Sequence, residues 1–211
     1  MVFAPATEGS GRGAQISPRS DYFGKKFGFC SGDTARKFDI IEIQMQTLYI
    51  MCGVGFSGKS TLAKKISEHI GAVLVSQDAM YFEKQKELNI DQDDDNQWRI
   101  LLDLCKEKIL DNLKQGKSVV FDNVSAKVEH REELRQLVKL ANAKTKVIFL
   151  DTPLEVQKER RLKNRETGER HDVKQEYLDQ AIKELEIPTK DEDVLVFKPD
   201  SNLETFLDSL K

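Results

Sequence analysis

Short apolar segments alternate with longer amphipathic segments from residue 45 onward, and this alternation predicts the secondary structure. The short segments are predicted strands, and they cover 47–52, 72–76, 118–122, 146–151 and 194–197. Between them, apolar residues recur at steps of three and four, which predicts helices over 59–70, 98–113 and 129–143. Strands that alternate with helices in this way are typical of a parallel sheet with helices on both faces.

Two capping patterns predict where further helices begin. Thr152-Pro153-Leu154-Glu155 combines an N-cap, a first-turn proline and a third-position glutamate directly after the fourth predicted strand. Ser201-Asn202-Leu203-Glu204 repeats the capping-box pattern and predicts a closing helix. The segment 81–97, by contrast, is predicted to be a loop on the substrate side. Its clustered aspartates either attract a cationic acceptor or are simply solvated, and we favour solvation; they are Asp91, Asp93, Asp94 and Asp95.

The first 44 residues differ in composition from the rest of the chain. They hold six of the 12 glycines and two of the five prolines, and they show no sustained period of 2 or 3.6 residues. We therefore predict a flexible N-terminal extension over 1–44 and a single domain over 45–211. One hypothesis places the biological start at Met45, just ahead of the first strand; the alternative is a genuine adaptor tail.

Composition and charge exclude little, so the function must come from motifs. The chain has 33 Lys plus Arg against 36 Asp plus Glu, and its net charge of −3 gives no argument for a nucleic-acid or membrane partner. No apolar run approaches the roughly 20 residues that span a bilayer. Cys30, Cys52 and Cys105 lack Cys-x-x-Cys spacing, and no secretory signal is recognisable, so we expect a cytoplasmic protein in which Cys52 and Cys105 are buried apolar side chains.

The sharpest signal is a phosphate loop between the first predicted strand and the first predicted helix. Gly53-Val54-Gly55-Phe56-Ser57-Gly58-Lys59-Ser60 matches G-x-x-x-x-G-K-[ST]. Such a loop turns successive N–H groups toward phosphate oxygens, and the helix adds its positive N-terminal end. We predict that residues 53–61, ending at Thr61, bind ATP. Lys59 would reach the outer phosphates, and the Ser60 hydroxyl would bind Mg²⁺.

A dinucleotide-binding site is the competing interpretation of the same glycines. Gly53, Gly55 and Gly58 also satisfy G-x-G-x-x-G, and Asp78 lies 20 residues past the last of them, where a ribose-binding acid is expected. The pair Lys59-Ser60 favours a nucleoside triphosphate, because a pyrophosphate held by backbone needs neither an ammonium group nor a metal-binding hydroxyl.

Two aspartates follow predicted strands, at the edge where open α/β sheets bind ligands. Asp78 comes after the second strand and could accept a proton from an acceptor hydroxyl, as a general base and substrate-binding residue in phosphoryl transfer. Its alternative role is a helix N-cap or turn. Asp122 ends the third strand and could order Mg²⁺ with Ser60, or it could simply form a turn before Asn123.

A basic segment over 158–174 is a candidate lid over the phosphates. It has an excess of three positive charges, and its basic residues are Lys158, Arg160, Arg161, Lys163, Arg165, Arg170 and Lys174. Arg161 and Arg165 are four apart and share a helix face, so they are the favoured catalytic pair, with Arg170 as a third candidate. The alternative is an ordinary solvated helix with salt-bridged neighbours.

Together these motifs resemble the P-loop kinases that include the 5′-kinase part of polynucleotide kinase, the chloramphenicol phosphotransferases and the zeta toxins. The resemblance covers roughly 47–197; it rests on the phosphate loop, Ser76-Gln77-Asp78, Phe121-Asp122-Asn123, Arg131, the segment 160–170, Ile187-Pro188 and Glu192-Asp193-Val194. It implies an AAA-type P-loop NTPase fold: a three-layer α/β/α sandwich with a mainly parallel five-stranded sheet and an arginine-rich lid. It also implies that Arg131 faces the acceptor or its phosphate.

Two functions remain open from the sequence. The first is an ATP- and Mg²⁺-dependent kinase that transfers the γ-phosphoryl group to a hydroxyl of a small molecule or a nucleic-acid end. Polynucleotide kinases of this group usually carry Arg before the base and Thr-Asn after the strand-three Asp, whereas Gln77 and Asn123-Val124 stand here, so nucleic acid is not the favoured acceptor. The alternative is a P-loop NTPase that acts as a nucleotide-dependent switch. The sequence names neither the acceptor nor the oligomeric state.

Overall fold

The computed structural model describes residues 45–88, 95–168 and 172–210. The chain divides into two units, Met1–Ile41 and Glu42–Lys211, and the described residues all belong to the second. The predicted extension over 1–44 lies outside the described residues, and so do Asp91, Asp93, Asp94 and Arg170.

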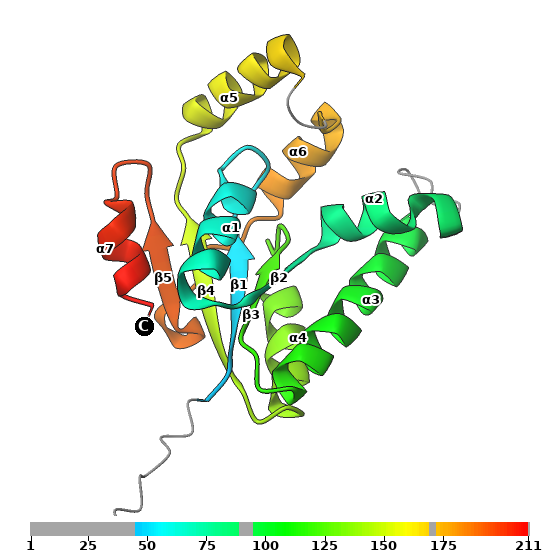
Figure 1. The fold of residues 1–211 in the computed structure, drawn as a ribbon. Coiled ribbons are helices and arrows are strands. Elements are labelled where there is room, and N and C mark those ends of the chain that lie inside the picture. The colour runs from blue at the N-terminus through cyan, green and yellow to red at the C-terminus, as the bar shows by residue number, and fades with distance from the viewer. Residues whose placement is uncertain (1–44, 89–94, 169–171, 211) are drawn as a thin grey trace, which may run out of the picture. The chain divides into compact units, whose positions relative to one another are not determined.

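The centre of the second unit is a five-stranded, entirely parallel sheet in the order β2-β3-β1-β4-β5 (Figure 1). Its strands are β1 (Thr47–Cys52), β2 (Val73–Ser76), β3 (Val119–Asp122), β4 (Lys144–Leu150) and β5 (Val194–Phe197). Ile50 of β1 is in register with Phe121 on one side and with Val147 on the other. The predicted strands and their parallel arrangement are therefore confirmed.

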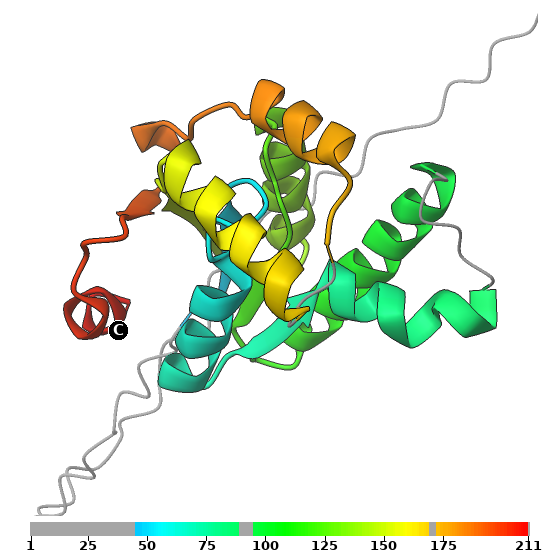
Figure 2. The ribbon, with the colours of Figure 1, turned by 90° about the horizontal axis from the view of Figure 1, so that it is seen from above.

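Helices cover both faces of this sheet, which gives the three predicted layers (Figures 1 and 2). Alternate β1 side chains enter opposite cores because successive strand residues point to opposite faces. Leu48 and Ile50 pack with α3 (Asp95–Lys114) and α4 (Val128–Lys139), whereas Tyr49 and Met51 pack with α1 (Lys59–Ile70) and α7 (Leu203–Asp208). Cys52 and Cys105 are both fully buried, as predicted. None of the helices in the described part of the chain has the length and apolar character to span a bilayer.

The predicted loop over 81–97 is wrong, because helix α2 (Gln77–Leu88) follows β2 directly and α3 already begins at Asp95. Helix α2 lacks the stripe that sequence periodicity detects. Its buried side chains, Met80 and Tyr81, are neighbours in the chain and join the core shared with α3.

Smaller differences concern helix ends. Helix α4 ends at Lys139 instead of continuing to 143, since the chain turns through Asn142 with a φ of 50°. Helix α5 (Leu154–Thr167) has Pro153 as its N-cap without a side-chain cap bond. Helix α7 is capped by Asn202, whose side chain accepts from Thr205 N–H at 3.0 Å. The structure also contains two elements that the pattern does not predict, α6 (Gln175–Lys183) and the 3₁₀ turn η1 (Lys190–Glu192).

Candidate nucleotide-binding site

The phosphate loop, residues 53–60, joins the carboxyl end of the central strand β1 to the start of α1. Gly58 is the N-cap of α1 and has a φ of 105°, a conformation that side chains rarely adopt. No side chain caps this helix start, and its first turn contains no acidic residue. The first N–H groups of α1 and the positive end of its dipole are therefore directed to an anion rather than to a capping side chain.

Lys59 is buried at the start of α1, and its Nζ donates to the carbonyl oxygen of Val54 at 2.9 Å. Burial lowers the pKa of Lys59, while the carboxylates of Asp122 and Asp78 act in the opposite direction. The strand register places both aspartates at the edge of the sheet where Lys59 begins α1. Ser76 is in register with Asp122, and Asp78 follows Ser76 by two residues.

The two predicted metal ligands fit a magnesium ion. Ser60 is exposed at the start of α1, and Asp122 is only 7% exposed at the end of β3. Among the described residues, no group of three or more His, Cys, Asp or Glu side chains could hold a metal ion. One hydroxyl and one carboxylate suit Mg²⁺, which retains waters and takes its remaining ligands from substrate phosphates.

Arg160 is the arginine of α5 that contacts the phosphate loop. Its Nη1 donates to the carbonyl oxygens of Ser57 at 2.7 Å and Phe56 at 3.2 Å. Thr152 also contacts the loop, since its hydroxyl donates to Ser57 O at 3.0 Å. This contact replaces the N-cap role that the sequence predicts for Thr152. The sequence pattern favours Arg161 and Arg165 instead of Arg160. Their spacing shows that they share one face of the helix, but it does not show which face of α5 meets the phosphate loop.

Arg161 and Arg165 are held by the segment before α6. Their Nε atoms donate to the two carboxylate oxygens of Asp172, at 3.1 Å and 2.8 Å respectively. Arg161 is buried and also donates to Gln175 and to the carbonyl oxygen of Val173. The hydrogen bonds from Arg165 and Arg161 lower the pKa of Asp172 despite some desolvation. The predicted pair thus joins α5 to α6 in this conformation.

A cavity of about 480 Å³ opens beside the phosphate loop. Its floor includes loop residues 56–58, and its walls come from α1, α5 and the segment after β5. Basic, hydroxyl and apolar side chains line it together, among them Thr61, Arg160, Lys163, Phe197 and Pro199. This mixture suits a ligand with a flat apolar part and an anionic part.

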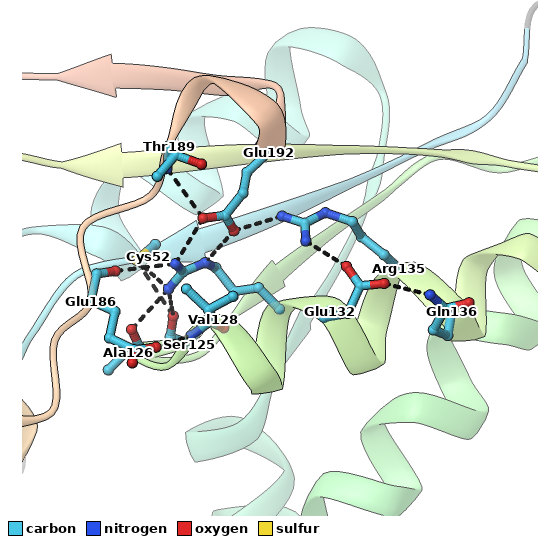
Figure 3. A network of polar contacts seen from close by, with 11 residues as sticks. Cys52, Ser125, Ala126, Val128, Glu132, Arg135, Gln136, Glu186, Thr189 and Glu192 are labelled. Atoms are coloured by element: carbon cyan, nitrogen blue, oxygen red, sulfur yellow. Dashed lines mark hydrogen bonds and ion pairs between the residues drawn. The ribbon is translucent and has the colours of Figure 1, made fainter.

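Arg131 does not lie in this site. It is 0% exposed, and its Nη1 donates to the carbonyl oxygens of Ser125 at 2.9 Å and Ala126 at 2.8 Å. Its Nε and Nη2 bind both oxygens of Glu192, at 2.7 Å and 3.0 Å. Figure 3 shows the Glu192 carboxylate also bridging to Arg135 and to the backbone of Thr189. The acceptor-facing role that the resemblance implies for Arg131 does not fit a guanidinium that is enclosed in this way.

Residues 48–188, more than half of the chain, match the family described as AAA domain. The chain belongs to the AAA domain family. None of the curated proteins matches its sequence.

Solved structures share the fold of this AAA domain at low sequence identity. A provisionally assigned kinase from Chloroflexus aurantiacus is 18% identical with a TM-score of 0.66, over 79% of this chain and 97% of its own. Chaetomium thermophilum Kti12, solved with ADP-AlF3, is 17% identical with a TM-score of 0.61, over 77% and 96%. The Mycobacterium tuberculosis APS kinase CysC, solved with AMPPNP and APS, is 18% identical with a TM-score of 0.59, over 79% and 95%. The predicted P-loop kinase fold is therefore confirmed.

Gly55 of this AAA domain lies tightly against α6. A Cβ at this position would be 2.3 Å from Cδ2 of Leu178, which is buried. We expect Gly55→Ala to lower the free energy of unfolding by about 1–3 kcal/mol, because the added methyl group forces Leu178 and α6 away from the loop. Urea unfolding measures this. In a Leu178→Ala background the same substitution should cost less, and an equal cost in both backgrounds would contradict the contact.

Proposed function

We propose that this AAA domain, residues 45–211, is an ATP-dependent kinase that transfers the γ-phosphoryl group to a hydroxyl of a small molecule or a nucleic-acid end. The observation that carries the proposal is that Asp78 and Asp122 follow β2 and β3 at the carboxyl edge of the sheet, where the phosphate loop and Lys59 follow β1. A nucleotide site needs only the loop and its lysine. An exposed carboxylate next to them adds a group that can accept a proton from an incoming hydroxyl.

The cavity beside the loop supports the binding of ATP. With the phosphates on residues 53–61, the base would extend into the space lined by Phe197 and Pro199. Arg160 and Lys163 also line this space. Arg161 and Arg165 would exchange Asp172 for phosphate oxygens when the lid closes, which would neutralise charge and exclude water.

In the proposed reaction, Asp78 accepts the proton of the acceptor hydroxyl. The oxygen of that hydroxyl forms a bond to the γ-phosphorus at the same time. The bond from that phosphorus to the β–γ bridging oxygen breaks, and ADP leaves. Lys59 stabilises negative charge on the outer phosphates. Ser60 and Asp122 would hold Mg²⁺, which neutralises phosphate charge when it is bound.

The thiols of Cys52 and Cys105 are buried and form no disulfide, which supports a cytoplasmic location for the enzyme.

The test is transfer of labelled γ-phosphate from ATP with Mg²⁺ to a panel of acceptors, which includes 5′-hydroxyl DNA and RNA, nucleosides, sugar nucleotides and hydroxylated antibiotics. We expect Asp78→Asn to lower the transfer rate by about 10²–10⁴-fold, because the amide cannot take the proton. ATP affinity should stay near that of the parent, since the phosphate loop is intact.

Two outcomes would contradict different parts of the proposal. Equal transfer by the parent and Asp78→Asn would make this carboxylate structural and would rule out its role as the base. Release of free phosphate alone, at equal rates in both proteins, would contradict the kinase function itself. That result would support the nucleotide-dependent switch, in which the lid responds to the bound nucleotide and no organic acceptor is used.

A further inference from the structure

An exposed aromatic side chain lies one helical turn beyond the proposed base. Phe82 follows Asp78 by four residues on α2, so the two side chains share a face, with Cβ atoms roughly 5–6 Å apart. Phe82 is 50% exposed, and Asp78 is exposed as well. A flat ring attached to an alcohol can therefore lie over the phenyl ring while the hydroxyl meets the carboxylate.

The orientation of this ring is supported from beneath. The ring of Phe82 meets that of Tyr81 edge-on, with centroids 5.2 Å apart and planes at 73°. Tyr81 is buried and stacks on Trp98 of α3, with centroids 5.2 Å apart and planes at 19°. Gln77 joins the same two helices, because its Nε2 donates to the carbonyl oxygen of Trp98 at 3.1 Å. Helices α2 and α3 thus form an aromatic platform (Phe82, Tyr81 and Trp98) beside Asp78, with little left to order on binding.

The charges on this face of α2 have both signs. In its first turns the exposed side chains are those of Asp78, Ala79, Phe82 and Glu83. Lys86 is exposed one turn beyond Phe82 on the same face. The recognition element beside Asp78 is therefore the aromatic ring rather than charge.

We infer that the acceptor is an alcohol with a flat, unsaturated ring about one helical turn from the reacting hydroxyl, as in a nucleoside. The ring stacks on Phe82 while the hydroxyl meets Asp78. The inference rests on the proposed kinase function, and it narrows the acceptor to this class. Stacking of bases on aromatic side chains contributes enough to change affinity about tenfold or more when the aromatic ring is lost.

Cytidine and ribose form a matched pair for the test, since both present a primary hydroxyl and only cytidine carries the flat ring. Binding is followed through Trp98, the one tryptophan of the chain, with a non-hydrolysable ATP analogue filling the nucleotide site. Labelled phosphate transfer gives KM and kcat for the same compounds. The proteins are the parent, Phe82→Leu, Phe82→Tyr, Asp78→Asn and, as a control at another exposed apolar position, Leu140→Ala.

We expect the parent to bind cytidine at least about tenfold more tightly than ribose. Phe82→Leu should remove this preference through KM with kcat retained, whereas Phe82→Tyr and Leu140→Ala should keep it. Asp78→Asn should bind cytidine without phosphorylating it. Equal affinity for cytidine and ribose, or an unchanged KM in Phe82→Leu, would overturn the inference while Asp78-dependent transfer upholds the kinase. Ring-dependent binding without transfer in any protein would instead overturn the kinase proposal, and with it the assignment of the ring to an acceptor.

Discussion

Lys59→Met should reduce phosphoryl transfer by at least about 10²–10³-fold and should weaken ATP binding at the same time. The ammonium group of Lys59 is buried, and one of its hydrogen bonds goes to the carbonyl oxygen of Val54 within the phosphate loop. Methionine fills a similar volume but provides neither the donor nor the charge. The outer phosphates would then lose the one cation that the loop itself supplies, at a position with little water to replace it.

Lys64→Met is the matched control, because Lys64 is an exposed lysine of the same helix α1. Its rate and ATP affinity should match those of the parent. Single-turnover transfer and ATP titration at constant Mg²⁺ measure both effects, and melting temperatures confirm that each protein is folded. If Lys59→Met transferred phosphate as fast as Lys64→Met, the assignment of the phosphate loop would be wrong. The Lys59→Met result does not distinguish a kinase from a nucleotide-dependent switch. The Asp78→Asn variant makes that distinction.

The parts of the fold that sequence predicts are those encoded by local patterns. Strands β1 and β5 and helix α1 have the predicted bounds because each is a continuous apolar run or a regular stripe. The glycines and Lys59 mark the phosphate loop for the same reason, since a short contiguous motif sets its geometry. Asp78 and Asp122 were recognisable as partners only through the rule that ligands bind at the carboxyl ends of parallel strands.

The parts that sequence does not predict depend on contacts between distant segments. Arg160 and Arg161 are adjacent in one basic helix, yet the first contacts the phosphate loop and the second binds Asp172. No periodicity distinguishes them. Arg131 is similar, because nothing local indicates that a charged residue of α4 will be fully buried against Glu192, 61 residues later. Helix α2 is not predicted, because it packs against α3 without an amphipathic stripe that the sequence pattern could reveal.

Breaking the buried pair of Arg131 and Glu192 should destabilise the fold more than breaking any other ion pair that the described residues form. Arg131→Met should lower the free energy of unfolding by about 3–5 kcal/mol, because it leaves the Glu192 carboxylate, only 6% exposed, without its bidentate partner. It also leaves the carbonyl oxygens of Ser125 and Ala126 without this donor. Arg135→Met should cost less, since Arg135 is partly exposed and gives Glu192 a single hydrogen bond. Urea unfolding at neutral pH compares the two, and an equal loss in both would contradict the ranking.

The Glu192 carboxylate should make the free energy of unfolding depend on pH within a defined acidic range. Burial acts to raise the pKa of Glu192, but hydrogen bonds from Arg131, Arg135 and Thr189 outweigh it and lower the pKa from 4.5 to about 2. A group whose pKa is lower in the folded state stabilises the protein above its unfolded pKa, and this contribution is lost as the pH falls toward the folded value. The parent should therefore lose stability between pH 4.5 and about 2.

Glu192→Gln should be less stable at neutral pH and should lose less stability over that pH range, because an amide does not titrate. Parallel curves for the two proteins would show that other carboxylates cause the acid unfolding. A flatter curve for Glu192→Gln would identify this one side chain as the acid-sensitive link between α4 and the segment that leads into β5.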